Sequence, residues 1–424
     1  MSKERVVVTG LGIVTALGTT VPKVWRRLAA GENGVTRITY FDASQYSSRV
    51  AAEVRLLPAT DGDSLPCPPD HCRRGVRLFL HAAREAHADA RLVEAPLPVR
   101  RMGVAAGTSV NYVNMRLIRR DFPFRRAEPP HVDVARLRRE APHPRLLFPR
   151  RLGDMTSVVA ARALGLGGPT LAIDTACAAS AYAVGEAFRM IQRGQADAMV
   201  AGGACSVVSP VGILAFSVLG ALSSNPDPDL ASRPFDRRRD GFVRGEGAGA
   251  VVLERHDHAR ARGARVYGEV AGFGSTLNAS NLTDPSPDGA SEERAMRLAM
   301  ADASTAPEEI DYVAAHGTST PKNDAVETGA IKRAFGSHAR RLLVSSNKGQ
   351  IGHTISAAGV CSLIFAFKAM EDGWVPPTAH LHEPDPQCDL DYVPNVGRRA
   401  PVRAALVNAF AFGGQNAALV VKAA

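Results

Sequence analysis

The chain has 424 residues, a formal net charge of +9, and a composition that is 45% hydrophobic but only 6% aromatic. This length exceeds one ordinary hydrophobic core, so two domains or two fused halves are expected. No stretch approaches the roughly 18 consecutive uncharged apolar residues that a membrane-spanning helix needs, and no secretory h-region precedes the first expected strand. We therefore expect a cytoplasmic protein that does not cross a membrane.

The cysteines and the charge narrow the function classes further. The six cysteines are scattered and include no Cys-x-x-Cys pair, which argues against a zinc site or a disulfide framework and for a reducing compartment. A basic balance can indicate nucleic acid, a membrane surface or an acidic protein partner. No nucleic-acid motif is present and aromatic residues do not alternate with the arginines, so an acidic protein partner is favoured.

The first elements alternate between buried strands and helices. Residues 5–14 predict a strand that ends at Gly10 in a glycine-rich turn. The Gly-x-Gly there lacks the third glycine and the later acidic residue of a dinucleotide site, which favours a tight turn instead. The next expected elements are a helix at 24–30, a Pro- and Asp-rich loop at 57–72, a helix at 76–92 and a strand at 102–107.

An arginine-rich segment follows over residues 113–152, with eleven arginines against four acidic residues. Its prolines make a continuous helix unfavourable. A solvated loop and an excursion that docks a partner or a second subunit are both open interpretations.

Residues 171–184 predict a short apolar strand that runs into a helix beginning at Cys177. The small residues around Cys177 would let a substrate approach the backbone closely. A helix start offers free N–H groups and a partial positive charge, and both are expected to lower the pKa of the thiol. On this stretch alone, a packed core cysteine is the commoner interpretation.

The later strands indicate an internal repeat. Strands are expected at 196–201, ending at Gly202-Gly203, and at 248–253. A strand with Gly-x-Gly at 267–275 echoes the first one, and a strand at 310–314 ends before His316 much as 171–175 ends before Cys177. We therefore predict two similar halves of alternating strands and helices, 1–255 with the basic insertion around 113–152, and 256–424.

Three further motifs place polar groups after expected strands. His316 opens a run of small and hydroxyl residues, Lys348 and His353 stand five residues apart, and residues 408–416 contain a Gly-Gly turn. Taken singly, these residues are explained by a core histidine, a surface lysine and a hairpin turn.

Together these motifs resemble the signatures of the β-ketoacyl-acyl-carrier-protein synthases, in particular the elongating branch. The matching stretches are Asp174-Thr-Ala-Cys177, Arg233-Pro-Phe-Asp236 with 239–249, His316-Gly-Thr-Ser-Thr320, 348–353 and 412–416. The resemblance implies a thiolase-like α/β fold, with two pseudo-repeated halves stacked in five layers as α-β-α-β-α. It also implies a dimer and an acidic acyl carrier protein as the partner.

The resemblance further implies a decarboxylative condensation that extends an acyl chain by two carbons. Cys177 would hold the acyl chain as a thioester, and backbone N–H groups of Cys177 and Phe412 would form the oxyanion hole. His316 and His353 would stabilise the enolate that forms when malonyl carrier protein loses CO₂. No metal or redox cofactor is required, because the substrates arrive on the phosphopantetheine arm of the carrier protein.

Supporting roles also follow from the resemblance. It assigns catalysis to Lys348 together with the cysteine and the two histidines, and support of the site to Asp324 and Glu327. Phe412 would gate the acyl pocket, with Gly413 and Gly414 as its hinge, and Val110, Tyr112 and Phe412 would line that pocket. Arg73 and Arg74 would dock the carrier protein. Simple helix-start carboxylates remain an equal interpretation of Asp324 and Glu327.

Some positions depart from the family pattern. Ala411 stands where relatives commonly have a glycine, which should stiffen the gate. Ser362 stands where many have a glutamate that pairs with the lysine, so the partner of Lys348 is open. These departures favour a type II polyketide ketosynthase, either a homodimer or a heterodimer with a chain-length-factor homologue.

Three alternatives to a type II polyketide ketosynthase are open. A housekeeping fatty-acid enzyme is the nearest. The second is a non-catalytic chain-length partner subunit, which Cys177 and both histidines argue against. The third is a thiolase or hydrolase, which would need a second cysteine or a base-orienting residue.

Overall fold

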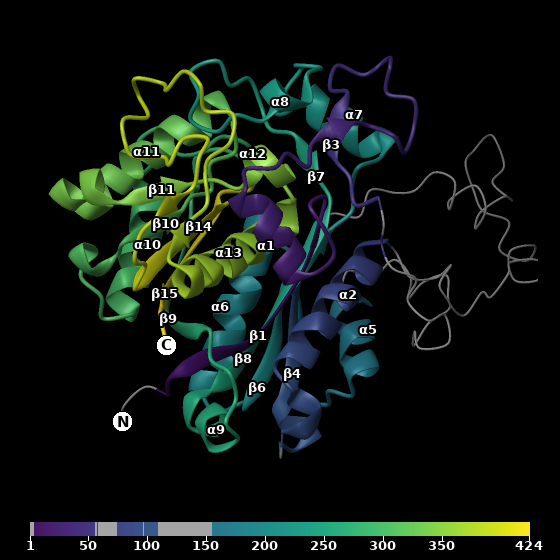
Figure 1. Ribbon diagram of the computed structural model, residues 1–424, viewed down its shortest axis with the longest axis vertical. Coiled ribbons are helices and arrows are strands. Elements are labelled where there is room, and N and C mark those ends of the chain that lie inside the picture. The colour runs from purple at the N-terminus through teal and green to yellow at the C-terminus, as the bar shows by residue number, and fades with distance from the viewer. Residues whose placement is uncertain (1–3, 56, 58–73, 96, 109–154) are drawn as a thin grey trace, which may run out of the picture.

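The computed structural model describes residues 4–55, 57, 74–95, 97–108 and 155–424 (Figure 1). The expected basic insertion at 113–152 and nearly all of the expected loop at 57–72 lie outside the described residues. Among the described residues no helix is long and apolar enough to cross a membrane.

One ten-stranded sheet, made of two five-stranded halves, organises the chain. From the centre outward, the first half contains β1 (Val6–Thr15), β8 (Gly247–Arg255), β6 (Ala198–Cys205), β4 (Met102–Gly107) and β5 (Thr170–Ile173). In the same order, the second half contains β9 (Gly268–Leu277), β15 (Gln415–Lys422), β14 (Ala404–Phe410), β10 (Tyr312–Ala314) and β11 (Leu343–Ser345). A short antiparallel pairing of β1 with β9 joins the halves.

The two halves repeat one topology. Outward from the centre, the pairings are antiparallel, antiparallel, parallel and parallel in both halves. This confirms the expected pseudo-repeat of two five-stranded mixed sheets. One expected correspondence is wrong: the counterpart of β5, which precedes Cys177, is β11, whereas β10, which precedes His316, corresponds to β4. Each half has two parallel outer strands, so a strand that ends before a polar residue in one half can resemble either of the two in the other half.

Helices complete five layers. Figure 1 shows α6 (Ala179–Gln192) and α13 (Ala358–Asp372) in the middle of the molecule, and they pack against each other and against both half-sheets. The outer face of the first half-sheet is covered by α2 (Arg74–Asp89) and α5 (Met155–Leu164), and that of the second by α10 (Ala290–Asp302) and α11 (Pro321–Phe335). The largest buried apolar cluster therefore lies between the sheets, around α6 and α13.

Glycines in the first strand allow a helix to approach closely. The prediction that the strand ends at Gly10 is wrong, because β1 continues through Gly10 and Gly12 to Thr15. A Cβ at Gly10 would lie 2.1 Å from the carbonyl oxygen of Ala86, and one at Gly12 would lie 2.0 Å from that of Ala82. Both alanines belong to α2, so the Gly-x-Gly pattern marks a helix–strand contact rather than a turn.

The same device recurs in the second half. Gly272 and Gly274 lie inside β9, and a Cβ at either position would meet carbonyl oxygens of α10 at 2.3 and 2.2 Å. Gly202 and Gly203, expected to end a strand, also lie within β6. The sequence echo between 7–13 and 267–275 therefore has a structural cause.

The remaining elements are short. They are α1 (Val21–Ala29), β2 (Thr36–Arg37), β3 (Val50–Ala52), α7 (Pro210–Val218), α8 (Pro228–Ala231), β7 (Arg244–Gly245), α9 (His256–Ala261), α12 (Lys348–Ile351), β12 (Trp374–Val375) and β13 (Arg398–Arg399), with 3₁₀ turns that include η7 (Ala176–Ala178) and η10 (Ile355–Ala357). The predicted strand at 102–107 matches β4, and the helices expected at 24–30 and 76–92 are α1 and α2 with shifted ends.

Candidate active site

A cavity of about 280 Å³ lies at the carboxyl ends of the outer strands, where the connections after β5, β10, β11 and β14 converge. Cys177, His316, His353, Phe410 and Phe412 line it. Residues from both halves of the chain therefore meet in one place, as expected for groups that follow parallel strands of one sheet.

Cys177 lies in the single 3₁₀ turn η7, and α6 begins two residues later at Ala179. The expected helix start at Cys177 is therefore displaced by one short turn. Ala176 has a φ of +44°, a backbone conformation that costs energy in a residue with a Cβ. Such strain is common where a side chain is held for function.

Burial controls the reactivity of this thiol. Cys177 is 5% exposed, and desolvation raises its pKa to about 11, against the opposing influence of Lys348, the Phe412 backbone N–H and Arg244. The expectation of a lowered pKa is wrong, because withdrawal from water outweighs the helix start when the thiol is enclosed. The thiolate therefore forms only with help from these neighbours.

His353 is the direct neighbour of the thiol. Its Nε2 lies 3.2 Å from the Cys177 Sγ, and its Nδ1 accepts a hydrogen bond from the Ile355 N–H at 3.2 Å. Burial, together with the positive charges of Lys348 and Arg244, holds the pKa of His353 well below its usual value. The imidazole is therefore neutral, and its proton lies on Nε2, facing the sulfur.

His316 completes the pair of imidazoles. Its ring is T-shaped against that of His353, with centroids 5.4 Å apart. Burial and Lys348 also hold the pKa of His316 well below its usual value. Its Nδ1 is buried and has no hydrogen-bond partner within the described part of the chain. Two neutral rings thus border one cavity.

Lys348 is buried behind the histidines and donates a hydrogen bond from Nζ to the His316 carbonyl oxygen. Burial lowers the pKa of Lys348 to about 8, although Glu327 and Cys177 oppose that shift. The hydroxyl of Ser362 accepts a hydrogen bond from Asn347 Nδ2 at 2.9 Å. The hydrogen-bond partner of Lys348 is therefore the backbone of His316, whereas Ser362 bonds to Asn347.

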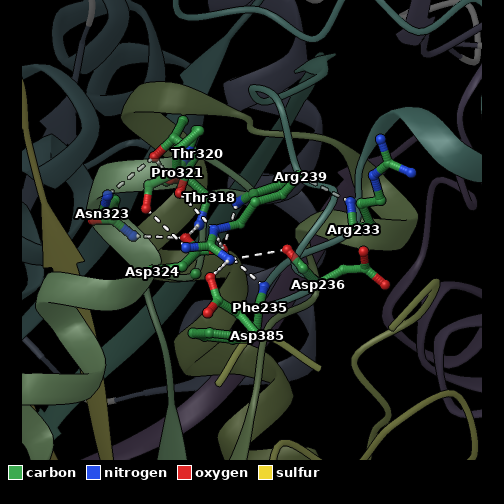
Figure 2. Close-up of polar contacts among 12 residues, drawn as sticks. Arg233, Phe235, Asp236, Arg239, Thr318, Thr320, Pro321, Asn323, Asp324 and Asp385 are labelled. Carbon is green, nitrogen blue, oxygen red and sulfur yellow. Dashed lines mark hydrogen bonds and ion pairs between the residues drawn. The ribbon is translucent and has the colours of Figure 1, made fainter. Parts of the chain in front are cut away.

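Two carboxylates from the first turns of α11 hold the backbone after His316. Glu327 accepts hydrogen bonds from the N–H groups of His316 at 2.8 Å and Gly317 at 2.7 Å. Asp324 accepts from those of Thr318 at 2.9 Å and Ser319 at 3.1 Å. Both carboxylates are fully buried, and burial raises their pKa values. Figure 2 shows Asp324 facing this loop.

The Gly-Gly turn lies between β14 and β15. Gly413 has a φ of +88° and Gly414 a φ of +81°, and these left-handed conformations require glycine. Phe412 precedes them, and its backbone N–H forms a hydrogen bond to Cys177. Its ring stacks on that of Phe216, with centroids 6.1 Å apart. The Phe412 side chain thus packs in the same apolar cluster as Cys177, next to two glycines in left-handed conformations.

Three predicted residues, Val110, Tyr112 and Arg73, lie outside the described residues. Arg74 opens α2 and forms an ion pair with Glu246, Nε to Oε1 at 2.8 Å, and a hydrogen bond to the Tyr40 hydroxyl at 2.7 Å. It does not line the cavity.

Sequence reasoning missed Arg244, which is fully buried beneath the site. Its guanidinium lies over the ring of Phe216 at 4.3 Å, and its charge opposes the raised pKa of Cys177. Its backbone neighbours hold His353: the His353 N–H donates to the Val243 carbonyl, and the Gly245 N–H to that of His353. The available signal was an arginine between Val243 and Gly245, in the glycine-rich stretch that leads into β8.

Comparisons with known proteins agree with this geometry. The N-terminal domain model of the β-ketoacyl synthases matches residues 3–259, and the C-terminal domain model matches residues 267–382. The chain is 40% identical to a 3-oxoacyl-[acyl-carrier-protein] synthase 2 of Synechocystis sp., over 100% of this chain and 99% of that protein. It is also 40% identical to the protein of that name from Coxiella burnetii, over 99% of each chain.

Solved structures are similar over the full length. One contains a type II polyketide synthase acyl carrier protein in complex with its ketosynthase bound to the hexaketide; it has a TM-score of 0.86 and 32% identity and covers 100% of both chains. Another is the ishigamide ketosynthase/chain length factor, with a TM-score of 0.86 and 34% identity over 100% of both chains.

Proposed function

Since this chain belongs to the β-ketoacyl synthase family and is an acyl-carrier-protein-dependent condensing acyltransferase, we propose that Cys177 carries the growing acyl chain and that His316 and His353 drive malonyl decarboxylation. The observation that carries this assignment is the contact of the Cys177 Sγ with a neutral His353 whose Nε2 bears the proton, at 3.2 Å.

The first step transfers an acyl chain to the cysteine. The thiolate of Cys177 attacks the thioester carbonyl of acyl carrier protein, and the phosphopantetheine sulfur leaves and takes the proton. Lys348, Arg244 and the Nε2–H of His353 stabilise the thiolate. The N–H groups of Cys177 and Phe412 receive the oxyanion, and each such donor contributes about 10²–10³ in rate.

The second step releases CO₂ from malonyl carrier protein. The bond between the carboxylate carbon and the α-carbon breaks, and its electron pair passes to the α-carbon and the thioester oxygen. Once Cys177 is acylated, the Nε2–H of His353 is free to donate to that oxygen, together with the ring of His316. Both imidazoles are neutral because burial and Lys348 disfavour a second positive charge. A neutral donor stabilises the enolate without transferring a proton to it.

In the third step the α-carbon attacks the Cys177 thioester. The new carbon–carbon bond forms, the cysteine leaves as a thiolate, and the β-ketoacyl chain remains on the carrier protein. Asp324 and Glu327 serve as backbone acceptors that hold the His316 loop, and Phe412 moves on Gly413 and Gly414 to admit the chain. These steps balance without a redox cofactor or metal, and we propose none.

For the pathway, we propose a type II polyketide system, supported by the full-length similarity to a type II polyketide ketosynthase and to a ketosynthase/chain length factor. Fatty-acid elongation is the second candidate, favoured by 40% identity to 3-oxoacyl-[acyl-carrier-protein] synthases 2. The presence of Cys177 beside two neutral histidines argues against a non-catalytic chain-length partner subunit. Val110 and Tyr112 remain our proposed acyl-pocket residues.

We further propose a dimer, with itself or with a chain-length-factor homologue, and an acidic carrier protein that docks on Arg73 and Arg74. Within the described residues, β5 is the outermost strand of its half-sheet and pairs only with β4. An open strand edge of this kind is a ready pairing surface. We also retain the division into halves at 1–255 and 256–424 as a proposal.

Intact-mass detection of acyl groups on the protein tests this function. We expect the wild type to gain one acyl group on Cys177 from acyl carrier protein and to release a β-ketoacyl chain two carbons longer when malonyl carrier protein is added. Oxygenated starter chains should load faster than saturated ones in a polyketide enzyme, and the reverse in a fatty-acid enzyme. Absence of acylation by every starter would contradict the assignment.

A further inference from the structure

Arg239 is a buried residue of the Arg233-Pro-Phe-Asp236 and 239–249 motif, and the proposed reaction steps do not use it. It is 7% exposed. Its Nε donates to the Thr320 carbonyl at 3.0 Å and its Nη2 to the Pro321 carbonyl at 2.8 Å. Its Nη1 donates to the Asp236 carbonyl at 2.9 Å and to the Asp385 carboxylate. Figure 2 shows these bonds fanning out from one guanidinium.

Two of these acceptors end the loop that begins with His316. This loop has an unfavourable backbone, with a φ of +33° at Gly317 and +67° at Ser319. A left-handed non-glycine residue costs on the order of 1–3 kcal/mol and persists only where its surroundings hold it. The loop N–H groups are held by Glu327 and Asp324. Arg239 holds the other end through carbonyl oxygens.

Arg239 also supports Asp324 through its charge. Its Nε lies 3.7 Å from the Asp324 Oδ2. Asp324 accepts N–H hydrogen bonds from Thr318, Ser319 and Phe235, which only an ionised carboxylate accepts without a competing O–H. Burial raises the pKa of Asp324, and Arg239 is the largest opposing influence. The other ionisable groups near Asp324 are Glu327, Lys348, Asp385, Cys388 and Tyr392.

We propose that Arg239 is a positioning residue that fixes the 316–321 loop, and through it the His316 imidazole, in the arrangement that malonyl decarboxylation requires. The proposal rests on the proposed function, since it assigns Arg239 to one of its two half-reactions. Arg239 acts through the loop and does not touch the substrate. None of its hydrogen bonds described above goes to the turn that carries Cys177, so acyl loading does not depend on it.

The test compares the two half-reactions in the full-length variants Arg239→Met and Arg239→Lys. Acyl loading is followed by intact mass, and decarboxylation by CO₂ release from malonyl carrier protein added to enzyme whose Cys177 is already acylated. In Arg239→Met, decarboxylation should fall about 10²-fold, as expected for a small misplacement, while loading stays near wild type. Arg239→Lys should recover part of the rate, because an ammonium keeps the charge but not the planar fork.

Arg262→Met is the matched control. Arg262 also pairs with a buried carboxylate: its Nη2 lies 2.7 Å from the Oε2 of Glu254, a residue of β8. Neither residue lines the cavity. The Arg262→Met variant should be less stable than wild type, but the ratio of its decarboxylation rate to its loading rate should be unchanged. If Arg239→Met decarboxylates like wild type, or loses both half-reactions equally, the proposal fails.

A pH profile separates positioning from general damage. Arg239 opposes the raised pKa of Asp324, so without Arg239 this carboxylate takes up a proton at higher pH, and decarboxylation in Arg239→Met should rise with pH more steeply than in wild type. Parallel profiles would overturn the proposal. If Arg239→Met does not fold, Asp385→Asn, which weakens one acceptor, must show the same selective loss at smaller size or the proposal also fails. Failure of both half-reactions in the wild type would instead overturn the proposed function.

Discussion

Two strand–turn–helix units of this protein have the same turn conformation, but their side chains have different surroundings. In the first half, β5 leads through η7 into α6, and in the second, β11 leads through η10 into α13. The turns read Thr175-Ala-Cys-Ala-Ala179 and Thr354-Ile-Ser-Ala-Ala358. The first residues of η7 and η10, Ala176 and Ile355, have φ values of +44° and +43°. Cys177 and Ser356 therefore occupy equivalent positions.

The equivalent side chains have different surroundings. The Ser356 hydroxyl donates to the Ala204 carbonyl at 2.5 Å, and the serine is fully buried. The Cys177 thiol borders the cavity and meets His353. Only Asp174 and Thr175 separate β5 from η7, whereas the longer connection after β11 carries Lys348 and His353. One copy thus carries Cys177, the proposed nucleophile, and the other carries Lys348 and His353.

The largest effect should come from removing the nucleophile or its histidines. Cys177→Ala should abolish acyl loading, because no other side chain in the turn can form the thioester. His316→Ala or His353→Ala should lower decarboxylation by about 10²–10³, the value of one enolate donor. Intact mass and CO₂ release measure the two effects separately.

The pseudo-repeat supplies a control for that experiment. Cys177→Ala combined with Ser356→Cys places a thiol at the equivalent turn of the second half, at a buried position that contacts the Ala204 carbonyl and does not line the cavity. This thiol should remain unloaded. Loading of this double variant would show that the turn alone makes a cysteine reactive and would contradict the asymmetry between the two units.

A smaller, pH-dependent effect should follow from Lys348→Met. The pKa of Lys348 is lowered to about 8, so its charge supports the Cys177 thiolate below that pH and is lost as the pH rises through it. Loading below pH 8 should fall by about tenfold, the effect of one pKa unit on the thiol. Above about pH 8 the loading rates of the variant and the wild type should converge, as measured by intact mass after quenching at fixed times. A constant ratio of the two loading rates from about pH 6.5 to 9 would exclude this role of Lys348.

The smallest effect should come from Ser356→Ala. Loss of its hydrogen bond leaves the buried Ala204 carbonyl without that donor, which costs about 1–3 kcal/mol of unfolding free energy. Urea unfolding measures the loss. Both half-reactions should keep their wild-type rates, since Ser356 does not line the cavity. A selective loss of one half-reaction would mean that the second turn also takes part in catalysis.

Much of the fold and site could be predicted from local sequence. Apolar strands followed by small or polar residues indicated two repeated halves, and the motifs around Cys177, His316 and His353 identified the residues that meet in the cavity. The prediction that the first strand ends at Gly10 was wrong, because a Gly-x-Gly pattern is compatible with a turn or with a close helix contact. Only the packing of α2 on Gly10 and Gly12 distinguishes the two.

The sequence by itself determined which chemical groups stand at the strand ends, because strand and turn patterns are local. Tertiary structure decided how those groups behave. Enclosure raises the pKa of Cys177, the Ile355 N–H places the proton of His353 on Nε2, and Lys348 bonds to the His316 backbone while Ser362 bonds to Asn347. Desolvation and hydrogen-bond geometry depend on how separate segments pack, as Cys177 and His353 do although 176 positions apart, so the local sequence pattern does not determine them.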